Sequence, residues 1–142
     1  MKVLVIGSGG REHAICWALN KSKKVDKIYC SPGNAGTDKI AINAKIDVSN
    51  FRNLEKFIKK ERIDLVIVGP EKPLVNGIVD FLEKKKVKVF GPNKYSSQLE
   101  GSKTFTKKIC DKYNIPTAKF KIIKNKDNLS KILETFSLPI VV

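Results

Sequence analysis

The sequence predicts an α/β fold with a doubly wound parallel sheet. Strand-like and helical patterns alternate along the chain, and four successive strand-like runs break into glycine loops at Gly7, Gly33, Gly69 and Gly91. This alternation favours parallel strands joined by right-handed helical crossovers. The carboxyl ends of such strands lie along one edge of the sheet, where ligands bind. We therefore expect the four loops to converge on one crevice.

Most of this sheet is expected within the first hundred residues. The expected strands cover residues 2–6, 27–30, 40–46, 64–68 and 87–90. Apolar residues recur at helical spacing over residues 11–21, and Trp17 on that helix is expected in the core. Ser49 or Asn50 can cap the next helix. A single helix is expected after Pro73, with its apolar side facing the sheet.

The pattern changes after residue 92. A short helix is expected over residues 94–100, followed by a helix capped by Ser102, a strand over residues 117–123 and a helix capped by Asp127. A new strand begins at Leu138. Because this strand has only just begun where the sequence stops, we expect the chain to be part of something longer.

The charge of the chain predicts a solvated surface rather than a nucleic-acid interface. The 142 residues include 28 lysines and arginines against 14 acidic residues, a formal net charge of +14. Only Arg11, Arg52 and Arg62 are arginine, and the lysines are scattered over every expected helix instead of gathering on one patch with aromatic residues. We expect no nucleic-acid partner.

Two further classes of protein do not fit the sequence. No apolar stretch reaches the ~18 residues of a membrane span, and no signal-peptide pattern precedes the first strand, so a cytoplasmic protein without a membrane partner is expected. Cys16, Cys30 and Cys110 are odd in number and far apart. They fit neither a disulfide framework nor a zinc site, and we expect buried or half-buried thiols.

The first glycine turn has the pattern of a phosphate-binding loop. Gly9 and Gly10 stand between an apolar strand and a helix, where backbone N–H groups favour an anion, and Arg11 could add a charged contact. The alternative is an ordinary strand-to-helix turn. A dinucleotide is disfavoured, because Glu12 replaces the third glycine of that fingerprint and Asp26 lies at the wrong end of its strand. The turn therefore predicts a single small phosphorylated ligand.

Other loops supply further candidates. Asn34 and Gly36 lie in the second glycine loop, which we expect at the same crevice. In the third loop, Gly69 and Pro70 precede Glu71, which either binds a ligand amine or hydroxyl or caps the following helix. His13 could form a dyad with Glu12, but adjacent helical residues diverge by ~100°, which favours a packing role. No catalytic residue and no metal ligand is assigned.

Several segments together resemble the amino-terminal third of the phosphoribosylamine-glycine ligase family, whose members are also called glycinamide ribonucleotide synthetases. The resemblance is collinear over the chain. The segments that carry it are Lys2–Ala14, Pro32–Gly36, Ile63–Leu74, Phe90–Pro92, Gln98–Lys108 and Ile115–Ala118.

The resemblance implies an enzyme of purine biosynthesis that joins glycine to 5-phosphoribosylamine with ATP and magnesium or manganese. It implies a Rossmann-like domain of residues 1–101, in which Asn34, Gly36 and Glu71 would lie nearer the ribose and amine of the substrate. An incomplete ATP-grasp domain would follow, of which residues 102–142 would be the opening. Small molecules would be the partners, and the full-length protein would be a monomer. This chain alone is then expected to be inactive and to hold no cofactor. The alternative is a free-standing module that binds a small molecule or a nucleotide phosphate without catalysis.

Overall fold

The computed structural model describes residues 1–124 and 128–141. The chain forms two compact units, Met1–Gly101 and Ser102–Val142. The first unit holds a sheet covered by helices. The second unit holds helices and extended segments in its described part.

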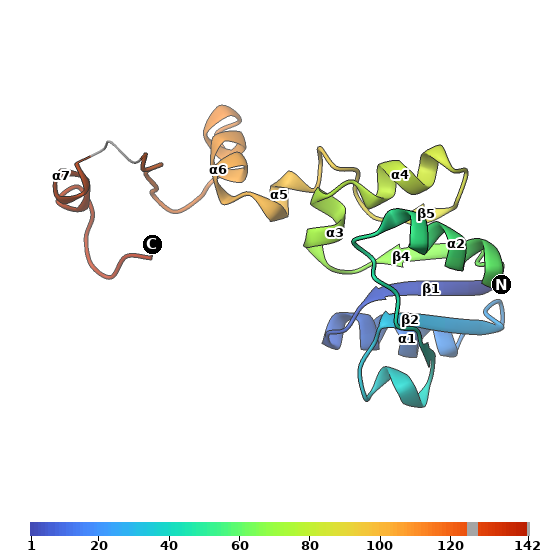
Figure 1. Ribbon diagram of the computed structural model, residues 1–142. Coiled ribbons are helices and arrows are strands. Elements are labelled where there is room, and N and C mark those ends of the chain that lie inside the picture. Colours follow the sequence, from blue (N-terminus) through green and yellow to red (C-terminus); the bar gives the residue numbers. More distant parts are fainter. Residues whose placement is uncertain (125–127, 142) are drawn as a thin grey trace. The chain divides into compact units, whose positions relative to one another are not determined.

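A five-stranded parallel sheet forms the centre of the first unit in the described part of the chain (Figure 1). The strand order is β3-β2-β1-β4-β5, and every neighbouring pair is parallel. This arrangement confirms the predicted fold class. The strands are β1 (Lys2–Gly7), β2 (Lys27–Pro32), β3 (Ile42–Asn43), β4 (Leu65–Val68) and β5 (Val89–Phe90).

Helices cover both faces of this sheet. Their bounds in the first unit are α1 (Gly10–Asn20), α2 (Phe51–Glu61), α3 (Glu71–Val75), α4 (Ile78–Lys84) and α5 (Gln98–Gly101), with a 3₁₀ turn η1 at Thr37–Lys39. Asn50 caps α2, because its side chain accepts a hydrogen bond from the Asn53 amide at 3.2 Å. Of the short helix expected over residues 94–100, only the part that begins at Gln98 is an α-helix, and it forms α5.

The central strand β1 divides the core into two layers. Successive side chains of a strand point to opposite faces. Leu4 and Ile6 pack with buried residues of α2 and α4, whereas Val3 and Val5 pack with Cys16 of α1. All four strand residues are at most 1% exposed. The continuous apolar run of β1 therefore results from burial on both faces, as a doubly wound sheet requires.

Two sequence-based expectations about the helices are wrong. The helix after Pro73 is interrupted between α3 and α4 at Gly77, whose φ of +90° is a left-handed conformation that a regular helix cannot contain. Trp17 is 54% exposed, and the Lys21 ammonium lies 3.2 Å from the centroid of its ring. Cys16, its neighbour, takes the core position instead.

The cysteines are free thiols, as predicted. Cys16 and Cys30 are buried, and Cys110 is half-buried. A hydrogen bond with Cys30, together with burial, raises the pKa of the Cys16 thiol. Cys16 therefore remains protonated and packs as a small apolar side chain.

The second unit carries α6 (Lys103–Lys112) and α7 (Leu129–Leu133). Ser102 caps α6, as predicted, by accepting a hydrogen bond from the Phe105 amide at 3.2 Å. The Asn128 side chain caps α7 through the Lys131 amide, and the expected Asp127 cap lies outside the described residues.

The strands expected in the second unit are wrong for its described part. Residues 117–123 and 138–141 contain no strand, and residue 142 lies outside the described part. An extended segment becomes a strand only by pairing with a neighbour. The described residues of this unit supply no such neighbour.

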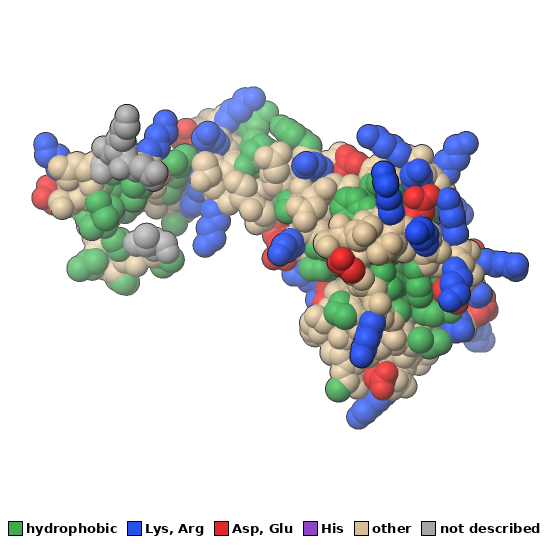
Figure 2. All heavy atoms as spheres, viewed as in Figure 1, with side chains coloured by type: hydrophobic (Ala, Val, Ile, Leu, Met, Phe, Trp, Pro, Cys, Tyr) green, Lys and Arg blue, Asp and Glu red, His purple; other side chains and the backbone are tan. Residues whose placement is uncertain are grey.

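Lysine and arginine side chains are seen on the visible faces of both units (Figure 2).

No helix in the described part of the chain is long and apolar enough to cross a membrane.

We predict that Glu61 contributes a pH-dependent part of the stability of the first unit. The Tyr29 hydroxyl donates to Glu61 Oε2 at 2.6 Å and, with weaker contributions from nearby lysines, holds the pKa of Glu61 below its ordinary value of 4.5. Because the folded-state pKa is the lower one, this stabilisation is complete above about pH 4.5 and is lost as the pH falls through the folded value. Urea unfolding of Glu61→Gln between pH 2 and 7 should show a stability deficit at neutral pH that shrinks below about pH 4.5.

Glu83→Gln, which neutralises an exposed carboxylate on α4, is the matched control. Any stability deficit of this variant should not shrink in this way as the pH falls. An equal deficit for Glu61→Gln at every pH would contradict the assignment.

Candidate functional site

Three glycine loops meet at the carboxyl ends of the central strands. The Gly33 amide donates to the Gly7 carbonyl at 3.1 Å, and the Gly69 amide donates to the Ile6 carbonyl at 3.0 Å. Gly91 follows β5, which is parallel to β4 and pairs with it. The predicted convergence of the loops on one edge of the sheet is therefore confirmed.

A buried carboxylate occupies the centre of these loops. Glu12 in the first turn of α1 is 5% exposed, and its Oε2 accepts a hydrogen bond from the Gly9 amide at 2.7 Å. A Cβ atom at Gly7 would lie 2.4 Å from Glu12 Cγ, and one at Gly69 would lie 2.0 Å from Glu12 Oε1. Both strand ends need glycine because the Glu12 side chain fills the space between them.

This contact changes the interpretation of the first glycine turn. The Gly9 amide, expected to face an anion, already donates to the Glu12 carboxylate. Gly10 is exposed and begins α1, with open space around the position of a Cβ atom. The Gly10 end of the turn is thus the accessible one, whereas the Gly9 end is closed by a negative charge.

Arg11 connects the first loop to the third. Its Nη1 donates to the Gly69 carbonyl at 2.6 Å, and its Nη2 lies 3.8 Å from Glu100 Oε1. The side chain is 58% exposed, so the contact with Glu100 is a weak surface ion pair. A guanidinium has five N–H donors, and Arg11 therefore retains donors for an anion at this edge of the sheet.

Asn34 connects the second loop to the first. Its Nδ2 donates to the Ser8 carbonyl at 2.8 Å, while its Oδ1 accepts from the amides of Gly36 at 2.7 Å and Thr37 at 3.0 Å. The His13 ring lies against Gly36, where a Cβ atom would be 2.9 Å from the imidazole Cε1. The packing interpretation of His13 fits this contact.

A cleft of about 450 Å³ opens beside these loops. Gly9 and Pro70 line it, whereas the other predicted site residues do not. Those six are Gly10, Arg11, Asn34, Gly36, Gly69 and Glu71. Glu71 is exposed at the first position of α3, with Pro70 at the cap position, so the helix-cap interpretation is wrong and the ligand contact stays a prediction.

Sequence reasoning missed most of the polar residues that line the cleft. They come from the three loops, from the segment before α2 and from α3: Ser8, Glu12, Ser31, Asp47, Ser49, Lys72 and Asn76. From the sequence, the segment before α2 is expected only to supply the cap of that helix. A short strand followed by Asp47 and Ser49 was the available signal, because polar residues after a parallel strand lie at the ligand-binding edge.

Acidic and hydroxyl groups dominate the polar part of the lining, beside the apolar side chains of Ile6, Pro32, Val48, Pro70 and Pro73. Asp47 Oδ1 accepts hydrogen bonds from the Ser49 hydroxyl at 2.6 Å and the Ser49 amide at 3.0 Å. The hydroxyl contact, followed by the amide contact, holds the pKa of Asp47 below its ordinary range. In the described part of the chain, Lys72 supplies the one positive side chain of the lining. Such a lining suits the hydroxyl and amine groups of a ligand better than a phosphate.

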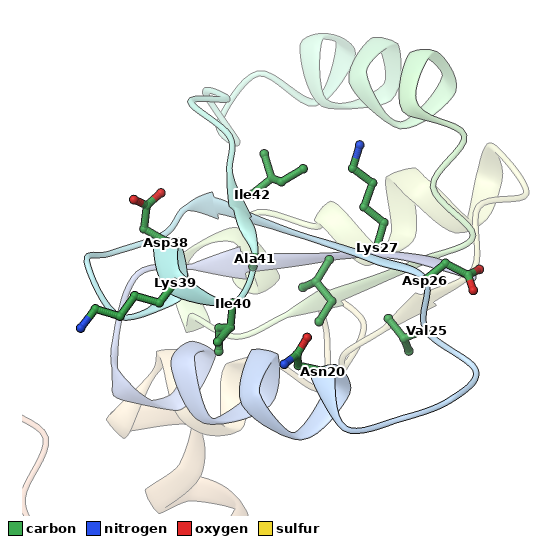
Figure 3. Close-up of a pocket in the computed structure, with 10 residues that line it drawn as sticks. Asn20, Val25, Asp26, Lys27, Asp38, Lys39, Ile40, Ala41 and Ile42 are labelled. Carbon is green, nitrogen blue, oxygen red and sulfur yellow. The ribbon is translucent and has the colours of Figure 1, made fainter.

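A second hollow, of about 380 Å³, lies along the beginnings of β2 and β3 (Figure 3). Asp26, Lys27, Asp38 and Lys39 surround it together with apolar side chains. It lies at the amino ends of these strands, and ligands of open α/β sheets bind at the carboxyl ends. We therefore assign the candidate site to the cleft beside the glycine loops.

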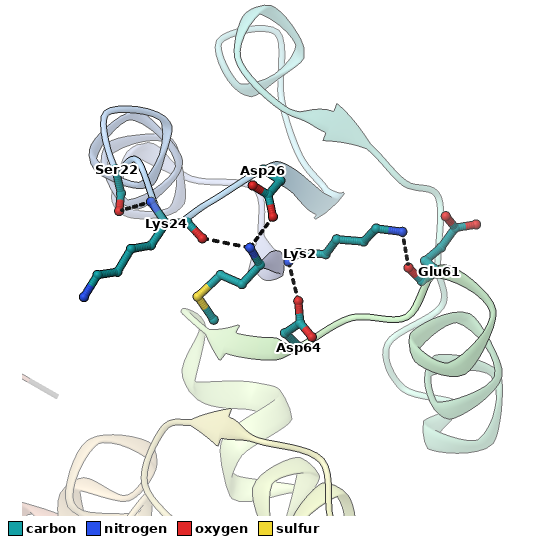
Figure 4. Close-up of polar contacts among 7 residues, drawn as sticks. Lys2, Ser22, Lys24, Asp26, Glu61 and Asp64 are labelled. Atoms are coloured by element: carbon teal, nitrogen blue, oxygen red, sulfur yellow. Dashed lines mark hydrogen bonds and ion pairs between the residues drawn. The ribbon is translucent and has the colours of Figure 1, made fainter.

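Polar groups at the amino edge of the sheet form hydrogen bonds and an ion pair between neighbouring segments of the chain (Figure 4). The Lys2 amide donates to Asp64 Oδ2 at 2.6 Å, and Lys2 Nζ donates to the Glu61 carbonyl at 2.9 Å. The Met1 amino group pairs with Asp26. These contacts give Asp26, excluded above as a ribose ligand, a structural role.

No group of three or more His, Cys, Asp or Glu residues within 1–124 and 128–141 could hold a metal ion.

Comparison with known proteins gives the family. Residues 1–100 match the family model described as phosphoribosylglycinamide synthetase, N domain. The chain belongs to the phosphoribosylamine-glycine ligase family. It is 48% identical over 142 residues to the phosphoribosylamine-glycine ligase of Caldanaerobacter subterraneus subsp. tengcongensis and 45% identical to that of Clostridium acetobutylicum. Both matches cover 100% of this chain and 34% of the relative, so the chain spans about a third of their length.

Solved structures agree with this assignment. The crystal structure of phosphoribosylamine-glycine ligase from Thermotoga maritima matches 96% of this chain and 31% of its own, with a TM-score of 0.70 and 33% identity. N5-carboxyaminoimidazole ribonucleotide synthetase from the same organism matches 97% of this chain and 37% of its own, with a TM-score of 0.66 and 20% identity. The second likeness shows the fold alone. These matches favour the predicted ligase family over a free-standing binding module.

We predict that Asn34 fixes the relative positions of the first two loops. Asn34→Ala removes the donor to Ser8 and leaves two amides without their acceptor, so it should lower the free energy of unfolding by about 1–3 kcal/mol in urea. Asn34→Asp keeps an acceptor for the Gly36 and Thr37 amides, so its free energy of unfolding should fall by less than that of Asn34→Ala. Equal stability of Asn34→Ala and the unmodified chain would show that the loops are held by other contacts.

Proposed function

We propose that this chain is the amino-terminal part of an ATP-dependent ligase that joins glycine to 5-phosphoribosylamine to give glycinamide ribonucleotide, ADP and phosphate. The collinear match over the whole chain to phosphoribosylamine-glycine ligases is the observation that carries the proposal. In this proposal, residues 1–101 bind the sugar substrate and residues 102–142 begin the ATP-grasp domain. A phosphorylated intermediate of this kind is retained inside the cell, so a cytoplasmic location is part of the proposal.

In the proposed function the cleft holds the sugar. The Asp47 carboxylate accepts hydrogen bonds from ribose hydroxyls, and the Ser49 hydroxyl forms hydrogen bonds with them. The contact between Asp47 and Ser49 at 2.6 Å holds the carboxylate in position. Glu12 shapes the floor through its contact with the Gly9 amide. Glu71 is not part of the cleft lining but lies between Pro70 and Lys72, which are, and the proposal assigns its exposed carboxylate to the substrate amine at the margin of the cleft.

The substrate phosphate is assigned to the margin of the cleft at Gly10 and Arg11. Arg11 donates to the carbonyl of Gly69, whose neighbour Pro70 lines the cleft, so the guanidinium lies close to its rim. Gly10 begins α1, where the positive end of the helix favours an anion. Asn34 and Gly36 act by holding the second loop against the first.

The proposed reaction requires ATP with magnesium or manganese, which neutralises charge during phosphoryl transfer. The described residues of this chain supply no cluster of metal ligands. We therefore assign neither metal nor ATP to residues of this chain, and no step of the proposal is routed through them.

We predict that Arg11→Ala weakens binding of ribose 5-phosphate more than binding of ribose. Loss of a hydrogen bond to a charged group costs ~1.5–3 kcal/mol, which corresponds to roughly tenfold to a hundredfold in affinity. Calorimetric titration of the 142-residue chain with both sugars measures the difference. Arg62→Asn is the matched control, because it removes another arginine at a left-handed backbone position that asparagine tolerates.

An equal loss for the two sugars would show that Arg11 is structural. An equal loss in Arg62→Asn would show that overall charge, rather than the loop, attracts the phosphate.

We predict the opposite pattern for Asp47. Asp47→Ala removes a hydroxyl-binding group and should weaken ribose and ribose 5-phosphate by the same factor, about tenfold. The same titrations measure it, and Asp38→Ala, which removes a carboxylate at the other hollow, should change neither affinity. A gain in affinity confined to ribose 5-phosphate would place the phosphate beside Asp47, because removing a carboxylate next to a phosphate relieves repulsion, and would overturn the proposed orientation.

A further inference from the structure

A groove on the outer surface of the first unit lies between α2 and α4, away from the glycine loops. It has a volume of about 430 Å³. Its lining consists of five charged side chains and one aromatic side chain: Arg52, Glu55, Lys56, Lys59, Phe81 and Lys85. None of these residues lines the cleft that is assigned to the sugar.

The helical spacing places the cations of α2 in a row. Arg52, Lys56 and Lys59 stand at positions i, i+4 and i+7 of α2, so they share one face of the helix over about 10 Å. Lys85, at the end of α4, closes the row from the other side. Lysine and arginine side chains gather over the α2 and α4 part of the surface (Figure 2).

The groove has a positive charge that its own residues do not neutralise. Glu55 is its one acidic side chain in the described part of the chain, and it pairs with Lys59 at 2.7 Å and Lys85 at 3.8 Å. Arg52 and Lys56 form no ion pair among the described residues. Four cations against one anion leave an excess of three positive charges.

The aromatic ring of Phe81 is the apolar part of the groove lining. Phe81 is half-buried and packs against Phe51 of α2 with a centroid distance of 5.4 Å. The Lys85 ammonium lies 5.9 Å from the Phe81 centroid. The contact between the two rings packs α2 against α4 and places the two sets of cations on either side of the groove.

We propose that this groove binds a linear oligophosphate, either free or as the phosphate tail of a nucleotide. A chain of linked phosphates can contact cations along most of the row at once, whereas a single phosphate reaches only part of its length of about 10 Å. The groove is separate from the site of the proposed ligase function, and its ligand binds independently of the sugar.

Titration of the 142-residue chain with inorganic tripolyphosphate tests the proposal. Saturable binding to one site is expected, and raising the salt concentration should weaken it because the site is exposed. The double variant Arg52→Ala/Lys56→Ala should weaken binding at least about tenfold. It should leave ribose 5-phosphate binding unchanged, which separates this site from the sugar cleft.

The control variant is Lys23→Ala/Lys24→Ala, which removes the same charge from the exposed turn after α1. Tripolyphosphate affinity should stay within about twofold in this variant. An equal loss in the two double variants, or the absence of saturable binding, would overturn the proposal. A parallel titration with ATP distinguishes the sources: tighter binding than tripolyphosphate supports a nucleotide, and equal binding supports the oligophosphate chain itself.

Circular dichroism and urea unfolding of both double variants establish that the fold is retained. Because Arg52 and Lys56 are exposed, both variants should unfold at the same urea concentration as the unmodified chain.

Discussion

The burial of Glu12 among the glycine loops is the constraint on which the candidate site depends. A carboxylate that is 5% exposed needs hydrogen-bond partners, and the Gly9 amide supplies one at 2.7 Å. The side chain also leaves no room for a Cβ atom at Gly7 or Gly69. One acidic residue therefore determines the backbone at the ends of β1 and β4, the conformation of the turn between β1 and α1, and the floor of the cleft.

The charges of the first unit are distributed in opposite ways on two surfaces. The chain carries a net charge of +14, yet the cleft contains Glu12, Asp47 and a single lysine in the described part of the chain. The groove between α2 and α4 has the reverse composition. A cleft with two carboxylates and one lysine among its described lining residues suits hydroxyl and amine groups, and the proposed function assigns the phosphate to its rim beside Arg11. The overall charge of the chain is thus a poor guide to the chemistry of its site.

Local patterns predicted some features of the fold correctly and failed for others, for identifiable reasons. The strands β1 and β4 and the caps at Asn50 and Ser102 depend on short-range apolar runs and side-chain hydrogen bonds, which the sequence displays directly. The interruption at Gly77 and the exposure of Trp17 depend on how helices meet the sheet. The segments of the second unit that were expected to be strands lack a pairing neighbour in its described part, and pairing is a property of the surroundings rather than of the segment.

The sequence by itself determined the class of the fold, the edge of the sheet at which the loops converge and the family. These follow from alternating periodicities, from the handedness of crossovers and from collinear motifs. Only the tertiary structure decided which groups face the cleft. It placed the Glu12 carboxylate on the Gly9 amide, directed Arg11 to the Gly69 carbonyl, and brought Asp47 and Ser49 beside the first loop. Such contacts join residues up to 58 positions apart, and their geometry is set by the packing of whole strands and helices, which no local pattern records.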